Sequence, residues 1–299
     1  MSTTGSTLTP SRPAARPAGS GRVRHVSVPV RAAVVAVLLA VALLWLTPLL
    51  WALKTSFTAE AETTAVPLEA VPESGFTADG YTSVLSGGDL LTWFVNSTVV
   101  AVVVTVLTVA VSALAAYGFS RCTFRGRGLL FALTVVGIMV PPQILVVPLY
   151  REVVAMGLAD TYWGIILPQV AVPAMVFILK AFFDGIPREL EEAARVDGAG
   201  ALRIFVQIVL PLSRSILAAV AIFVFIGAWN NFLWPFIITS NPDLMTLPVG
   251  LVQVQSSFGV RYAQVMASAL LAGLPLIIVF MLFQRQIIRG VATTGLGGQ

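Results

Sequence analysis

The sequence predicts an all-α, polytopic membrane protein with six transmembrane helices and with its N- and C-termini in the cytoplasm. Three observations predict this fold class. Of the 299 residues, 57% are hydrophobic and 11% are charged, whereas a soluble domain carries about 25% charged residues. Six apolar runs are each long enough to cross a hydrocarbon core of roughly 30 Å as a helix. Finally, Lys and Arg gather in alternate loops between these runs.

The N-terminal segment, residues 1–31, is rich in Ser, Thr, Pro, Gly and Arg and has no periodic apolar pattern. This composition is typical of a disordered tail. The first apolar run follows directly and is too long for the core of a signal peptide, so we expect it to be a retained span. The sequence therefore predicts a cytoplasmic tail at 1–31, one transmembrane domain at 32–290, and a short cytoplasmic tail at 291–299.

The order and orientation of the spans follow from the apolar runs and the basic loops. The expected spans are 32–53, 93–119, 129–149, 162–183, 216–238 and 265–284. With the N-terminus in the cytoplasm, all but three of the 18 basic residues lie in cytoplasmic segments, the exceptions being Lys54, Arg151 and Arg261. This is the distribution that the positive-inside rule requires. Membrane topology thus explains the net charge of +4, and we expect a membrane lipid environment and no nucleic-acid partner.

Several kinds of chemistry are disfavoured by what the chain lacks. All fourteen acidic residues fall in the predicted loops, whereas ion-coupled carriers usually need carboxylates within the membrane. Such a carrier remains an alternative only with sodium sites built from backbone carbonyls. Neither of the two lysines, Lys54 and Lys180, follows a glycine, so there is no phosphate-binding loop. One cysteine and one histidine can form no metal centre. We expect no cofactor on this chain and no enzymatic activity.

The stretch "GIPRELEEAARVDGAG", between the fourth and fifth runs, carries the signals of a short helix. Pro187 suits a first helical turn, acidic residues follow it near the N-terminal end, and Gly198 is a natural stop. The spacing predicts a helix of about ten residues with a narrow stripe of mostly small residues. That stripe consists of Leu190, Ala193, Ala194 and Asp197. The composition alone favours a solvated connector, with a helix that fits into another protein as the alternative.

This stretch resembles the EAA motif of binding-protein-dependent ABC importer permeases. A Glu-Ala-Ala triplet is followed after three residues by Gly, after nine more by Ile, and then by Leu-Pro. The matching positions are Glu192, Ala193, Ala194, Gly198, Ile208, Leu210 and Pro211. The likeness covers about residues 32–290, and "AWNNFLWPFIITSNPDLMTLPVGL" is similar to the carbohydrate branch, in particular to the smaller permease of maltose and glycerol-phosphate importers. Ser215, where the family often has proline, departs from the pattern.

The resemblance implies the membrane-spanning permease subunit of an ATP-driven carbohydrate importer in the bacterial cell membrane, working by alternating access. It implies two ABC ATPase subunits, which bind the ATP, a second homologous permease, and an extracytoplasmic sugar-binding protein. The short helix, between transmembrane helices 4 and 5, would be the coupling helix that enters a cleft on the ATPase. Its coupling residues would be Glu191, Glu192, Ala193, Ala194, Asp197 and Gly198. The alternative is the same type of importer for glycerol phosphate or polyamine.

Polar residues beside prolines within the spans mark a candidate path for the solute. Proline frees backbone groups, and membranes tolerate this where neighbours or a water-filled cavity satisfy them. Amides at such places can bond sugar hydroxyls, and indole rings can stack on apolar sugar faces. The candidates for the substrate path are Gln143, Trp229, Asn230 and Asn231. Bridging between helices is the alternative role for such amides, and we favour it for Asn96 and Gln169.

Overall fold

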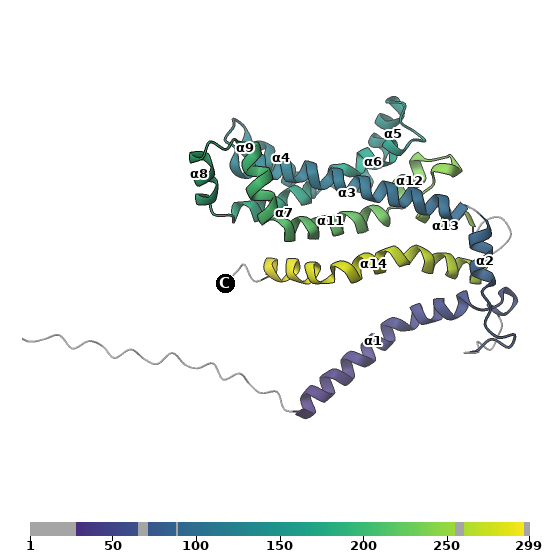
Figure 1. Cartoon of the computed structure of the whole chain (residues 1–299). Helices are drawn as coiled ribbons and strands as arrows, with labels where there is room; N and C mark the ends of the chain where they lie inside the picture. The colour runs from purple at the N-terminus through teal and green to yellow at the C-terminus, as the bar shows by residue number, and fades with distance from the viewer. Residues whose placement is uncertain (1–27, 65–70, 88, 255–259, 296–299) are drawn as a thin grey trace, which may run out of the picture. The chain divides into compact units, whose positions relative to one another are not determined.

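The computed structural model describes residues 28–64, 71–87, 89–254 and 260–295, and every regular element in these ranges is helical (Figure 1). The chain divides after Leu49 into two units, which are considered separately. The first unit contains most of α1 (Val28–Ser56), an exposed apolar helix that includes Pro48. Residues 28–31 of the expected N-terminal tail therefore belong to a helix, and the rest of that tail lies outside the described residues.

The second unit holds the remaining helices and short turns. Its longer elements are α2 (Asp79–Ser86), α3 (Asp89–Arg121), α4 (Arg127–Ile138), α5 (Val146–Ala155), α6 (Tyr162–Val170), α7 (Pro173–Asp184), α8 (Glu189–Val196), α11 (Arg214–Trp229), α13 (Leu247–Val254) and α14 (Tyr262–Gly295). Its shorter elements are η1 (Glu60–Glu62), η2 (Pro142–Leu145), α9 (Ala201–Ile204), η3 (Phe205–Val209), α10 (Leu210–Leu212), α12 (Leu233–Ile238) and η4 (Pro242–Leu244). Because α14 continues to Gly295, residues 291–295 of the expected C-terminal tail are helical, and the last four residues lie outside the described ranges.

Helix α3 is the central element of this unit and packs against α6, α7, α11 and α13. Its 33 residues contain no proline and correspond to about 50 Å at the usual helical rise. Asp89 in the first turn and Arg121 in the last turn both suit the helix dipole. The buried core beside α3 includes Val104, Leu179 and Ile204. In Figure 1, α8 and α9 lie at one end of α3, and α12 and α13 lie near the other end.

Three of the expected spans are single helices, and two, 129–149 and 162–183, coincide with bent helix pairs, whereas the fifth candidate covers 201–229 and not the expected 216–238. The helices Pro29–Ser56, Asp89–Arg121 and Tyr262–Gln284 are each long and apolar enough to cross a membrane. Three further candidates are bent pairs: Arg127–Ile138 with Pro142–Ala155 at 99°, Tyr162–Val170 with Pro173–Asp184 at 46°, and Ala201–Leu212 with Arg214–Trp229 at 80°. The described residues thus contain three candidate spans, or up to six if each bent pair counts as one.

The break between α6 and α7 has a direct cause in the sequence. Pro173 has no backbone N–H and disfavours helical geometry in the preceding residue. Val172 accordingly adopts φ −114° and ψ 95°, and α7 begins at Pro173. The run 216–238 is also interrupted, because α11 ends at Trp229 and α12 begins only at Leu233, with residues 230–232 between them.

Asn96 has the bridging role that we favour from the sequence. It is 3% exposed, and its Nδ2 donates to the carbonyl oxygens of Asp243 at 2.8 Å and Met245 at 2.9 Å. The Tyr162 hydroxyl lies 2.5 Å from the Asn96 Oδ1 and donates to it. These bonds connect α3 to α6 and to the loop that follows α12.

Candidate functional site

A cavity of about 580 Å³ lies where the broken helices meet. Such a volume falls in the range of about 300–1,000 Å³ that is typical of small-molecule sites. Its walls come from the end of α4, from η2 and α5, from the α6–α7 break, and from the start of α12. The backbone at the two proline-containing breaks, α4–α5 and α6–α7, and at the α11–α12 break therefore surrounds one hollow.

The polar side chains at this cavity are amides and one indole, whose N–H donates to the Gly164 carbonyl at 3.0 Å. Gln143, Gln169 and Asn231 line it together with Trp234. The Asn231 Nδ2 donates to the Gln169 Oε1 at 2.7 Å, and the Gln169 Nε2 donates to the Ile165 carbonyl at 2.7 Å. Gln143 is exposed and forms no side-chain hydrogen bond within the described part of the chain. It therefore presents a free amide to a solute.

The structure separates the four residues expected on the substrate path. Gln143 and Asn231 line the cavity, whereas Trp229 and Asn230 do not. Trp229 is 3% exposed, packs edge-on against Phe94, and donates its Nε1–H to the Ala272 carbonyl at 3.3 Å. Asn230 is exposed and its Nδ2 donates back to the Ile226 carbonyl of its own helix at 2.8 Å. The side chains of both residues therefore make their contacts within α11 or with neighbouring helices, and not at the cavity.

Helix α8 contains the residues expected to couple the chain to a partner. It has eight residues and begins at Glu189, shorter and later than the ten-residue helix that the sequence predicts from Pro187. Asp197 caps its C-terminal end, and Gly198 has φ +80°. That left-handed conformation favours glycine, as expected for the position where the chain turns towards α9.

The burial of the α8 side chains differs from what the expected small-residue stripe predicts. Glu191 is 3% exposed, and its Oε1 lies 2.8 Å from the Nε of Arg121, so this carboxylate faces the body of the molecule. Ala194 is half-buried and packs against the main core. On the opposite side, Glu192 and Ala193 are exposed, and Val196 is 88% exposed. An apolar side chain that exposed on a short polar helix is available to a partner surface.

The comparisons with known proteins agree with this arrangement. Residues 108–293 match the family described as "Binding-protein-dependent transport system inner membrane component". The chain belongs to this family. It is thus the membrane permease component of a transport system and not an enzyme.

Relatives and solved structures extend the match over most of the chain. The arabinooligosaccharides transport system permease of Bacillus subtilis is 37% identical over 74% of this chain and 79% of its own length. The trehalose/maltose transport system permease of Thermococcus litoralis is 35% identical over 86% of this chain and 94% of its own. A bacterial ABC transporter for the polysaccharide alginate has the same fold, with a TM-score of 0.78, 23% identity, and coverage of 86% of this chain and 96% of that one.

Three contributions to these sites were not predicted from the sequence. Arg121 was counted only as a topogenic charge, and its partner Glu191 is seventy positions away. Gln169 was expected to bridge helices, which it does, but it also lines the cavity. Val196 lies between Ala194 and Asp197 but is not part of the expected small-residue stripe, and only its apolar character within an acidic helix could have indicated it.

Proposed function

We propose that this chain is the membrane-spanning permease subunit of an ATP-driven, binding-protein-dependent carbohydrate importer. The observation that carries the proposal is a family match over residues 108–293 that includes both α8 and most of the cavity wall. Permeases that are 33–37% identical to this chain are named for arabinooligosaccharides, trehalose/maltose and diacetylchitobiose. A cavity lined by amides and an indole is chemically suited to such solutes.

The charge of the cavity favours a neutral sugar over the alternative solutes. A relative from Yersinia pestis, the sn-glycerol-3-phosphate transport system permease, is 39% identical over 66% of this chain. A phosphate would be expected to meet Arg or Lys, and a polyamine to meet carboxylates. Among the described residues that line the cavity, none is charged. Neutral hydroxyls are therefore the better match to Gln143, Gln169 and Asn231.

In this proposal the chain has six spans, three of them broken, and both termini in the cytoplasm. Helix α8 then lies on the cytoplasmic side, where it docks on an ABC ATPase. Two ATPase subunits, a second homologous permease and an extracytoplasmic sugar-binding protein complete the importer in the bacterial cell membrane. ATP binding brings the ATPases together and carries the coupling helices with them, which opens the solute path outward. The chain itself holds no nucleotide.

The test is the ATPase activity of the assembled complex in lipid vesicles, measured with the binding protein and a panel of solutes. We expect a neutral oligosaccharide to stimulate hydrolysis, and glycerol phosphate and spermidine to leave it at the basal rate. Stimulation by glycerol phosphate alone would transfer the assignment to the phosphate importers. If the purified permease carries no ATPase subunit at all, the proposed function is wrong.

A further inference from the structure

A buried ion pair joins α8 to the end of α3. Arg121 is the last residue of α3, Glu191 is the third residue of α8, and their side chains are 4% and 3% exposed. The Arg121 Nε and the Glu191 Oε1 lie 2.8 Å apart, although the N–H does not point along this line closely enough for a regular hydrogen bond. Buried charges are costly unless they are paired. Their burial together therefore needs a structural or functional reason.

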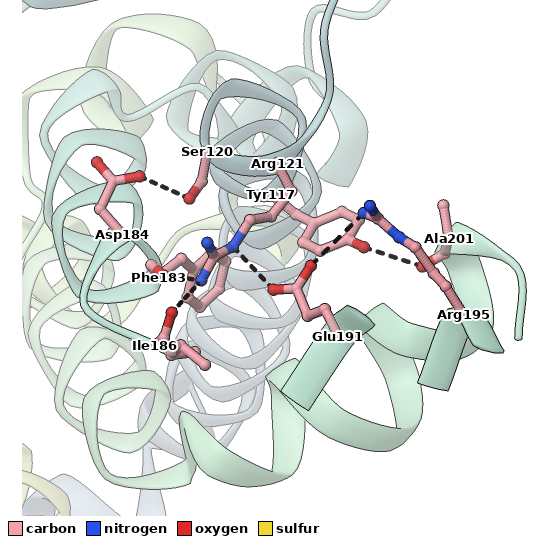
Figure 2. A network of polar contacts seen from close by, with 9 residues as sticks. All are labelled: Tyr117, Ser120, Arg121, Phe183, Asp184, Ile186, Glu191, Arg195 and Ala201. Atoms are coloured by element: carbon pink, nitrogen blue, oxygen red, sulfur yellow. Dashed lines mark hydrogen bonds and ion pairs between the residues drawn. The ribbon is translucent and has the colours of Figure 1, made fainter. Parts of the chain in front are cut away.

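The same guanidinium also holds the end of α7. The Arg121 Nη2 donates to the carbonyl oxygens of Phe183 at 2.5 Å and Ile186 at 2.7 Å. Both carbonyls lie just before α8, at and after the end of α7, where carbonyls lack partners within the helix, and the Phe183 carbonyl also accepts from the Ile186 N–H at 3.1 Å. One side chain thus joins three segments, namely α3, the end of α7, and α8 (Figure 2).

The last turn of α3 also contacts the chain on both sides of α8. The Ser120 Oγ donates to the Asp184 Oδ1 at 2.6 Å, before α8. The Tyr117 hydroxyl donates to the Ala201 carbonyl at 3.2 Å, after α8. Figure 2 shows these contacts arranged around the Arg121–Glu191 pair. The opposite face of α8 takes no part in them, because Val196 is 88% exposed.

We propose that Arg121 and Glu191 are a positioning pair that sets the place of the coupling helix relative to α3 and α7. Helix α8 then moves as one body with the inner ends of these two helices, and motion of the ATPase reaches the spans that surround the solute path. The Arg121 bonds to two backbone carbonyls fix the guanidinium, and the guanidinium fixes the only fully buried charge of α8. This inference rests on the proposed function, because it assumes that α8 meets the ATPase.

The test must distinguish a change in the position of α8 from a loss of stability of the whole permease. It therefore uses a variant that leaves no unpaired buried charge. Replacing a buried ion pair by apolar residues of similar volume is generally tolerated, whereas removing one partner is not. The double variant Arg121→Met/Glu191→Met should therefore insert and assemble. The matched control is Arg125→Met, which changes an exposed arginine four positions away that forms no ion pair or side-chain hydrogen bond within the described ranges.

Two measurements are made on each variant. The first is the distance distribution between spin labels at Leu114→Cys on α3, an exposed position, and Val196→Cys on α8, in a Cys122→Ser background, with the full chain in lipid nanodiscs. The second is the number of sugar molecules imported per ATP hydrolysed by the assembled importer without labels. For the double variant we expect a shifted or broadened distance distribution and at least a tenfold lower transport ratio. The Arg125→Met control should match the unaltered protein in both.

The remaining outcomes show separately whether the positioning role or the proposed function is wrong. An unchanged distance distribution, or a transport ratio within twofold of the control, overturns the positioning role. If the double variant does not accumulate, Glu191→Gln takes its place, because it keeps the Arg121 bonds to the carbonyls and removes only the charge of Glu191, which also lies 3.9 Å from the exposed Arg195 guanidinium. It should lower the ratio about threefold, and a normal ratio again overturns the inference.

If the unaltered complex shows no ATP-driven uptake, the proposed function fails, and the distance measurement alone decides the positioning role.

Discussion

Two adjacent amides, Asn230 and Asn231, have different surroundings although they are indistinguishable in the sequence. Asn230 follows directly after α11, and its side chain bonds back to that helix. Asn231 lies one residue further on, in the break before α12, and bonds the Gln169 side chain at the cavity wall. Asn230 is the C-terminal cap residue of α11, and of the two residues only Asn231 lines the cavity.

This difference gives the prediction at the residue scale. Asn231→Ala and Gln143→Ala should each weaken transport, because a lost hydrogen bond to a neutral solute costs about 1 kcal/mol, or roughly fivefold in affinity. Asn230→Ala should leave transport unchanged and serves as the matched control. The measurement is the solute concentration that gives half-maximal uptake in reconstituted vesicles. If Asn230→Ala is the most impaired of the three, the cavity is not on the solute path.

Polar residue types beside prolines were enough to indicate this region of the sequence. They were not enough to predict which of these residues line the cavity. Gln143 and Asn231 line the cavity and Trp229 does not, and the role of these residues on a substrate path stays a prediction. An indole at the end of an apolar helix can face a cavity or a neighbouring helix. The choice depends on α14, whose Ala272 carbonyl accepts the Trp229 N–H from 43 positions away.

At the scale of the element, α8 has an inner face fixed by charge and an outer face that is open. Its start and stop signals, Pro187 and Gly198, are local to this stretch, so the sequence predicts the existence of α8 and its end just before Gly198. Which face turns inward depends on Arg121 in α3, and no local pattern encodes that contact. Consequently Ala194 packs inward, and Val196 takes the exposed position.

Two substitutions on opposite sides of α8 should affect different properties, namely the stability of the permease and its attachment to the ATPase. Ala194→Leu overpacks the contact with the permease's own core, which costs about 1–3 kcal/mol, so its unfolding temperature should fall. Val196→Asp changes a side chain that is 88% exposed, so the unfolding temperature should not change, but less ATPase should co-purify. Both quantities are measured on purified complexes in one detergent. Equal ATPase recovery with Val196→Asp and with unaltered protein would remove Val196 from the docking surface.

At the scale of the whole molecule, composition and the positions of the basic loops are sufficient to predict a membrane protein. They do not predict which spans are broken. Apolar runs predict where the chain enters the bilayer, and α1, α3 and α14 are continuous there. The runs at 129–149 and 162–183 read as equally apolar, yet they are bent by 99° and 46° at their prolines. Hydropathy averages over such breaks, and it is the breaks that enclose the cavity.

The proposed orientation predicts which exposed loops an impermeant thiol reagent reaches in intact cells. In a Cys122→Ser background, cysteines at Glu73 and Asp243 should react, and cysteines at Arg125 and Arg203 should react only after the cells are opened. All four positions are exposed in the structure, so burial does not explain a difference in labelling. Reaction at Arg203 in intact cells would place α8 outside and contradict its role as a coupling helix.

The most direct test of the central claim is the energy source for uptake. The importer is reconstituted with its ATPases, second permease and binding protein, and uptake of a labelled oligosaccharide is measured with ATP on the ATPase side. The account predicts that uptake requires ATP and the binding protein, and that ionophores which collapse proton and sodium gradients leave its rate unchanged. Uptake that proceeds without ATP and stops on addition of an ionophore would show an ion-coupled carrier and contradict the account.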